Sequence, residues 1–136
     1  MIKAVLFDFD GTLADTAPDL GHALNRQRII RGLPELPIEQ IRPVASAGSR
    51  GLLALGFNIK PGDQGYEQMR DEFLDFYTQR LCHDTQLFQG VSELLEQLKL
   101  RGLPWGIVTN KPARFTRPLL QLLGLEQQTA CVVCGD

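Results

Sequence analysis

The sequence predicts an α/β protein built on a parallel sheet, with a wholly helical insertion after its first strand. Two observations lead to this fold class. Short apolar runs precede Asp8 and fill 104–109 and 129–134, and helical patterns separate the last two. Strands that alternate with helices in this way are typical of parallel α/β sheets. The stretch 14–86 shows helical patterns and no convincing strand, so we expect it to form a separate domain. The core would then consist of 1–13 and 87–136.

The first strand ends in a cluster of acidic and turn residues. Val5-Leu6-Phe7 is a continuous apolar run, which indicates burial on both faces of a sheet. Asp8-Phe9-Asp10-Gly11-Thr12 follows, at the position where parallel sheets bind their ligands. Two carboxylates this close repel each other unless a cation lies between them, and a divalent metal with a phosphate is the simplest answer. The alternative is a solvated corner, because Asp and Gly are ordinary turn residues.

Helices account for the insertion. A capping residue and an early proline at 15–19 predict the start of the first helix, which Gly32 ends. The clearest helix is Tyr66–Cys82, where an apolar stripe opposes charged residues. Between these two we expect a short helix at Ile38–Arg42, a loop at Pro43–Gly51 and a helix at Arg50–Leu55.

The core resumes near residue 87. The expected elements are a helix at Ser92–Leu100, a strand at Pro104–Thr109, a helix at Ala113–Leu123 and a strand at Thr129–Cys134. Thr109 ends its strand, so its hydroxyl would share the sheet edge with Asp8. A hydroxyl beside the N–H groups that open a helix can hold a phosphate oxygen, and Lys111 adds positive charge. The alternative for Thr109 is a helix cap.

Composition excludes several classes of function. Net charge is −2 with acids and bases mixed along the chain, which predicts neither nucleic-acid nor membrane-surface binding. No signal-like segment or apolar stretch of about 18 residues occurs, and the three cysteines form no framework, so we expect a cytoplasmic protein. Cys131 and Cys134 are expected to be small buried residues, because residues three apart on a strand face opposite sides. His22 and His83 lack partners at metal or triad spacing.

The string Phe7-Asp-Phe-Asp-Gly-Thr-Leu13, paired with Trp105-Gly-Ile-Val-Thr-Asn-Lys-Pro112, resembles two motifs of the haloacid dehalogenase-like (HAD) hydrolases. Within that family the chain looks most like the phosphoglycolate phosphatase-like branch, and within the branch like N-acetylmuramic acid 6-phosphate phosphatases. The resemblance implies a partial Rossmann-like core with an inserted α-helical cap. It also implies a Mg²⁺-dependent phosphomonoester hydrolase acting on a small phosphorylated metabolite through an aspartyl-phosphate.

The resemblance also implies roles for individual residues. Asp8 would be the nucleophile and Asp10 the general acid and base, while Mg²⁺ would bind the Asp8 carboxylate and the Asp10 main-chain carbonyl. Thr109 would hold a phosphoryl oxygen. The remaining candidates for phosphate or substrate binding are Phe9, Gly11, Thr12, Asn110, Lys111, Gly48, Ser49 and Arg50. Gly48-Ser49-Arg50 is the candidate specificity loop, in which Arg50 either clamps a second anionic group or is a solvated helix-start residue.

The sequence departs from the family pattern at its C-terminal end. The family's later motifs supply a lysine and an acidic pair, and neither follows the last expected strand; Lys111 lies in a different loop and is not expected to substitute. Losing one preorganised charge typically lowers a rate by about 10²–10³, so we expect the 136-residue chain to be inactive or impaired. An unpaired first strand would favour a homodimer or a swapped assembly. The competing functions are a sugar phosphomutase, tested by isomerisation assays, and an inactive fragment or interaction module.

Overall fold

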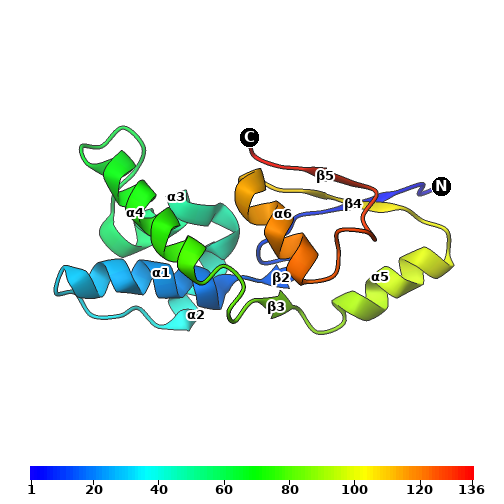
Figure 1. Ribbon diagram of the computed structural model, residues 1–136, viewed down its shortest axis with the longest axis horizontal. Coiled ribbons are helices and arrows are strands. Elements are labelled where there is room, and N and C mark those ends of the chain that lie inside the picture. The colour runs from blue at the N-terminus through cyan, green and yellow to red at the C-terminus, as the bar shows by residue number, and fades with distance from the viewer. The chain divides into compact units, whose positions relative to one another are not determined.

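The computed structural model describes residues 1–136 and consists of two compact units (Figure 1). Unit 1 comprises Met1–Asp15 and Gln86–Asp136, and unit 2 comprises Thr16–Thr85. Unit 1 carries a parallel sheet with helices between its strands, and unit 2 is helical. The predicted α/β class is therefore confirmed.

The sheet of unit 1 has the strand order β1 (Val5–Phe7), β4 (Trp105–Val108) and β5 (Cys131–Val133), and all three strands are parallel. The chain crosses it in one direction, from β1 to β4 to β5. Crossovers between parallel strands are almost always right-handed, so α5 (Val91–Leu100) and α6 (Ala113–Leu122) are expected on the same face. Exposed side chains at Leu6, Val108 and Val133 mark the other face.

Burial of the sheet follows from this arrangement. Trp105 and Ile107 point to the helical side and are buried. Leu6, Val108 and Val133 alternate with those positions along their strands and are 63%, 45% and 54% exposed. The expected burial of the first strand on both faces is therefore wrong for this chain: one face of β1 is open to solvent. Cys131 shares that exposed face, so its predicted burial is also wrong.

A pair of two-residue strands closes unit 1 where the insertion leaves and returns. β2 (Ala14–Asp15) pairs antiparallel with β3 (Gln86–Leu87), and Phe88 N–H donates to the Leu13 carbonyl at 3.1 Å. We expected no strand between 14 and 86, and these elements are too short to produce a period-two pattern.

Unit 2 packs α1 (Ala17–Ile30) against α4 (Tyr66–Gln79) and α3 (Gly48–Phe57). Leu24 is fully buried, and Gly56 allows α3 to approach it, since an added β-carbon would lie 2.6 Å from the Leu24 Cδ1 atom. Phe73 and Tyr77 stack in the core with ring centroids 6.4 Å apart.

The connection before α3 differs from the prediction. After α2 (Ile38–Ile41), Arg42–Ala47 form a 3-10 helix where we expected a loop. Pro43 supplies a preset backbone angle in its first turn, and Gly48, where the 3-10 helix ends and α3 begins, adopts a φ of 65°. Small residues here reflect tight helical turns, not an irregular loop.

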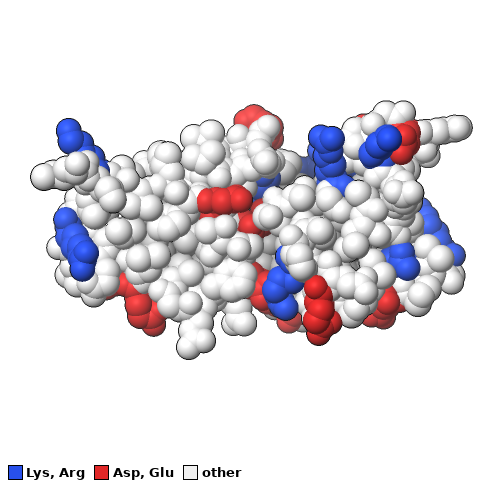
Figure 2. All heavy atoms as spheres, turned by 180° about the vertical axis from the view of Figure 1, so that it is seen from behind, with Lys and Arg blue, Asp and Glu red and all other residues white.

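The surface carries charges of both signs. Figure 2 shows Lys and Arg interspersed with Asp and Glu on the face it presents, in keeping with a net charge of −2. None of the helices combines the length and the apolar character that crossing a bilayer requires.

Candidate active site

The turn after β1 presents its two carboxylates in opposite ways. The Phe9 carbonyl accepts hydrogen bonds from the N–H groups of Thr12, Leu13 and Ala14 at 3.1–3.2 Å. Phe9 and Leu13 are both buried and anchor the turn. Asp8 is left exposed, with its Oδ1 accepting the Phe9 N–H at 2.7 Å. Asp10 is 5% exposed, so the two neighbouring acids have different surroundings.

The backbone amides of this turn are partly engaged. Gly11 N–H donates to the Ala14 carbonyl at 2.9 Å, and its φ of 78° is one that glycine adopts easily. Thr12 N–H donates to the Phe9 carbonyl at 3.2 Å. Phe9, Gly11 and Thr12 were candidate phosphate contacts, but in this structure their amides have partners within the turn.

A second loop follows β4 at the same edge of the sheet. β1 and β4 are parallel neighbours, so Asp8 and Thr109 each lie just beyond the carboxyl end of adjacent strands. Thr109 is buried, and its Oγ1 accepts the Lys111 N–H at 3.1 Å. Asn110 between them is exposed. The hydroxyl therefore shapes the loop that leads into α6.

The residues after β5 hold this second loop in place. Gly135 N–H donates to the Lys111 carbonyl at 3.1 Å, and the Asp136 Oδ1 accepts the Ala113 N–H at 2.9 Å, at the start of α6. Gly135 approaches so closely that an added β-carbon would lie 2.1 Å from the Asn110 carbonyl oxygen. Gly135 thus supports the Asn110–Lys111 backbone and Asp136 the start of α6, roles that sequence reasoning missed.

Lys111 joins the two loops. Its Nζ lies 3.0 Å from the Asp10 Oδ1, and each side chain is only 7% exposed. Burial lowers the pKa of the Lys111 ammonium from its ordinary value, and the Asp10 carboxylate opposes that change. The sequence indicated a positive charge near the site but gave no sign that it would pair with Asp10, because the partners are 101 residues apart.

The other candidate residues lie in unit 2. Gly48, Ser49 and Arg50 form the first turn of α3, so the expected specificity loop is instead the start of a helix. Arg50 is exposed and Gly48 and Ser49 are half-buried.

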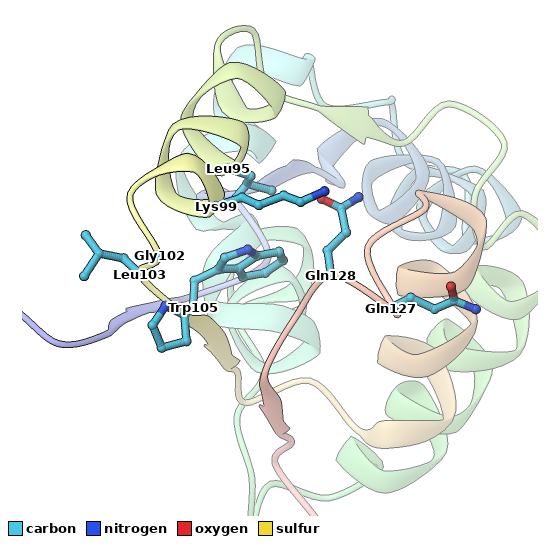
Figure 3. Close-up of a pocket in the computed structure, with 8 residues that line it drawn as sticks. Leu95, Lys99, Gly102, Leu103, Trp105, Gln127 and Gln128 are labelled. Carbon is cyan, nitrogen blue, oxygen red and sulfur yellow. The ribbon is translucent and has the colours of Figure 1, made fainter.

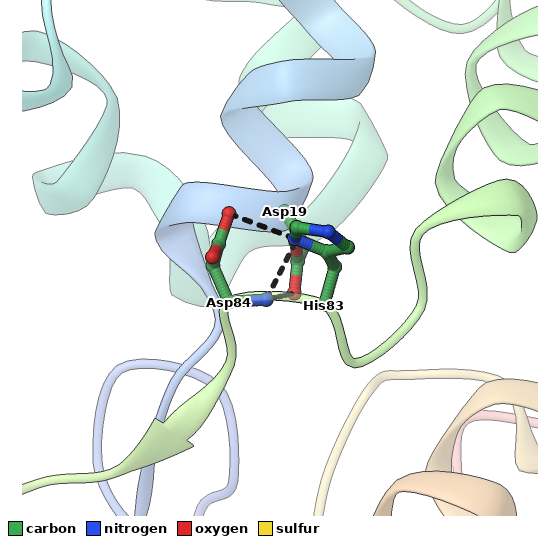
Figure 4. A group of neighbouring side chains, drawn as sticks. All are labelled: Asp19, His83 and Asp84. Atoms are coloured by element: carbon green, nitrogen blue, oxygen red, sulfur yellow. Dashed lines mark hydrogen bonds and ion pairs between the residues drawn. The ribbon is translucent and has the colours of Figure 1, made fainter.

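Unit 2 also brings His83 together with two carboxylates, which we did not expect. One possible metal-ligand atom from each of Asp19, His83 and Asp84 lies within 4.8 Å of the other two (Figure 4). Asp19, however, is fully buried and already accepts the N–H groups of Asp84 and Thr85 and the Thr85 hydroxyl at 2.8–3.1 Å. The Arg80 guanidinium lies beside both acids, 3.0 Å from the Asp84 carboxylate. We therefore interpret this cluster as a structural one, in which hydrogen bonds join the first and last residues of unit 2, and not as a metal site.

A pocket of about 420 Å³ in unit 1 lies away from the two loops that hold Asp8 and Thr109 (Figure 3). Leu95, Lys99 and Trp105 line it together with Gln127 and Gln128. Trp105 opens β4, whereas Thr109 follows its other end. The pocket thus belongs to the opposite end of the strand from Thr109.

Comparison with known proteins gives consistent matches. A family model described as haloacid dehalogenase-like hydrolase matches residues 5–136. An N-acetylmuramic acid 6-phosphate phosphatase from Pseudomonas putida is 43% identical over 135 residues, 99% of this chain and 60% of the relative. A phosphoglycolate phosphatase from Xanthomonas campestris pv. campestris is 43% identical over 134 residues, 98% of this chain and 60% of the relative.

A solved structure agrees with these relatives. The crystal structure of a predicted phosphoglycolate phosphatase from Haemophilus somnus superposes with a TM-score of 0.83 at 25% identity, covering 99% of this chain and 63% of that one. The chain spans about 60% of the length of the two curated relatives.

Proposed function

Because this chain belongs to the haloacid dehalogenase-like hydrolase family, we propose that it carries the reacting carboxylates of a Mg²⁺-dependent phosphomonoester hydrolase. The observation that carries the proposal is the contrast between an exposed Asp8 and a buried, lysine-paired Asp10 at the carboxyl edge of the sheet. Two acids in such different surroundings can take different chemical roles.

Asp8 is the proposed nucleophile. Its carboxylate is exposed beyond β1, where a phosphate ester can approach it. Attack on phosphorus forms a bond from a carboxylate oxygen and breaks the bond to the leaving alkoxide, which gives an aspartyl-phosphate. The Phe9 N–H that bonds Asp8 Oδ1 orients the attacking group.

Asp10 is the proposed general acid and base. It gives a proton to the departing alkoxide, and in the second step it takes a proton from the water that attacks the aspartyl-phosphate. That step releases inorganic phosphate and restores Asp8. An alkoxide leaves poorly without a proton, so this role favours alkyl phosphate esters as substrates.

The loop after β4 is the proposed phosphate contact. Thr109 and Asn110 lie in the loop that leads to α6, whose N-cap is Pro112, and the dipole at a helix N-terminus favours an anion. The Ala113 N–H at that end already donates to the Asp136 carboxylate. On the other loop, Phe9, Gly11 and Thr12 remain proposed contacts. Phosphate would have to compete with the turn for the amides of these residues.

The carboxylates present suit magnesium. Mg²⁺ is commonly held by one or two carboxylates together with waters and substrate phosphate, and Asp8 offers an exposed carboxylate of that kind. The Asp10 carboxylate faces the Lys111 ammonium, so we assign only its main-chain carbonyl to the metal. The bound ion would offset negative charge between the nucleophile and the phosphate.

Unit 2 is the proposed cap domain that selects the substrate. The substrates in the relatives' names, phosphoglycolate and N-acetylmuramic acid 6-phosphate, are both alkyl phosphates that carry a carboxylate. Arg50 is an exposed guanidinium at the start of α3 and would pair with such a carboxylate in bidentate fashion. We therefore propose a small carboxylate-bearing phosphate ester as the substrate class.

The test is phosphate release from these two esters with and without Mg²⁺. Because the sequence predicts impaired turnover for this chain, we expect slow Mg²⁺-dependent release that Asp8→Asn abolishes. Asp15→Asn, which changes an acid outside the proposed site, serves as the control. Arg50→Ala should raise the KM for a carboxylate-bearing ester about tenfold and leave p-nitrophenyl phosphate unchanged. Release that survives Asp8→Asn would overturn the proposal.

A further inference from the structure

The Lys111–Asp10 pair is built into rigid parts of both loops. The Lys111 N–H is held by the Thr109 hydroxyl, and its carbonyl is held by the Gly135 N–H. Asp10 lies within the turn whose carbonyl at Phe9 accepts three N–H groups. Both partners therefore extend from backbone that hydrogen bonds hold in place.

Stability alone does not account for such a pair. Removing two charges from water costs several kcal/mol, and buried ion pairs can often be replaced by apolar residues without loss of stability. With each side chain 7% exposed, this pair is in that category. Lys111 also has no part in the chemistry proposed for Asp8 and Asp10.

We propose that Lys111 is the positioning residue of Asp10: its ammonium holds the Oδ1 atom, so that the other carboxylate oxygen is directed at the leaving-group oxygen and carries the transferred proton. This inference rests on the proposed function, because it assigns a helper to the acid of that reaction. It differs from the expectation that Lys111 serves phosphate directly.

Esters with different leaving groups distinguish the two possible roles of Lys111, which are positioning Asp10 and binding phosphate. A p-nitrophenolate departs without a proton, whereas an alkoxide such as that of phosphoglycolate requires one. Both esters give the same aspartyl-phosphate, so a residue that positions the acid should slow the formation of that intermediate from the second substrate only. A residue that binds phosphate, or that merely stabilises the fold, should slow its formation from both.

With the whole chain and Mg²⁺, the experiment measures the single-turnover rate at which each ester releases its leaving group. We expect Lys111→Met to lower this rate about 10²-fold for the alkyl ester and to change it less than about fivefold for p-nitrophenyl phosphate. Lys111→Arg, which keeps the charge, should recover part of the loss. Near-ultraviolet dichroism of Trp105 verifies that each variant is folded.

Asp10→Asn separates failure of this inference from failure of the proposed function. If Asp10→Asn is selective for the alkyl ester and Lys111→Met lowers both equally, the inference is wrong and the function stands. If Asp10→Asn itself lowers both equally, the acid role fails and the inference fails with it.

A second measurement needs no turnover. The carbon NMR resonance of the Asp10 carboxylate should move when Lys111 becomes Met and return most of the way with Arg. If the unchanged chain hydrolyses neither ester, the hydrolase proposal fails for this chain. If the Asp10 resonance does not shift in Lys111→Met, the positioning role is wrong as well.

Discussion

The Asp19 carboxylate and Thr85 join the two ends of the helical unit. Asp19, in the first turn of α1, accepts both the N–H and the hydroxyl of Thr85 at 2.8–2.9 Å, although 66 residues separate them. The Asp84 N–H donates to the same carboxylate. The fully buried Asp19 side chain therefore holds the beginning and the end of unit 2 together.

Asp19→Ala should destabilise unit 2 by about 3 kcal/mol, because it leaves several buried donors without an acceptor. Urea unfolding followed by far-ultraviolet dichroism reports on this helical unit. Asp71→Ala, at an exposed position of α4, is the matched control and should change stability by less than about 0.5 kcal/mol. Because the carboxylate is already hydrogen-bonded, a chelator should leave the unfolding midpoint unchanged; a midpoint that falls with EDTA would indicate a metal at this cluster instead.

The Asp10–Lys111 pair should show strong coupling in a double-mutant cycle. Lys111→Met alone removes the cation beside the buried Asp10 carboxylate and should cost about 3–5 kcal/mol, whereas Asp10→Asn with Lys111→Met should cost less than the sum of the single changes. The fluorescence of Trp105, which lies in unit 1, monitors unfolding of the relevant unit. Strict additivity would mean that the two groups do not interact.

Stability of unit 2 should depend on pH through Glu72. Burial raises the pKa of Glu72, but hydrogen bonds from Arg31 and Gln27 and the charge of Arg31 outweigh it, so the folded-state pKa lies below the ordinary value. The unfolded chain then binds the proton more readily. The stabilisation is present above the unfolded pKa and is lost as pH falls through the folded pKa.

Glu72→Gln should remove that part of the pH dependence. Because the pair is partly exposed, the difference between the two proteins should be at most about 1 kcal/mol at neutral pH, and it should vanish once the pH lies below the folded-state pKa. Urea unfolding across this range measures it. If the free energies of unfolding of the two proteins differ by the same amount at every pH, Glu72 makes no contribution to the pH dependence.

The exposed face of the sheet should promote self-association. Leu6, Val108 and Val133 present an apolar surface, and β1 has an unpaired edge in the three-stranded sheet. We propose a homodimer or swapped assembly through this region, and expect Leu6→Lys to lower the apparent mass in light scattering. A monomer at high concentration that Leu6→Lys leaves unchanged would contradict the proposal.

The elements that hold the site followed from local signals. A continuous apolar run, an Asp-Gly turn and a strand that ends in Thr109 predicted the parallel strands, because each signal spans only a few residues. The exposure of Leu6 could not be predicted in this way, since it depends on which sheet face the helices cover. The sequence pattern did not predict the 3-10 helix before Gly48, because small residues are common both in loops and in tight helical turns.

Contacts between distant residues were the other limit. Lys111 was expected to add positive charge, but its pairing with Asp10 depends on how two loops are placed by neighbouring strands. The support that Gly135 gives to Asn110 likewise depends on a close backbone approach that no motif spacing reveals. Sequence reasoning found the candidate residues, and the structure shows which of them touch.

The central claim is that Asp8 attacks phosphorus. Its most direct test is to quench the chain during reaction with phosphoglycolate and Mg²⁺, reduce any acyl-phosphate with borohydride and sequence the peptide that contains both Asp8 and Asp10. We expect homoserine at Asp8 alone, and none in Asp8→Asn. Homoserine at Asp10, or phosphate release without modification of either acid and undiminished in Asp8→Asn, would contradict the account.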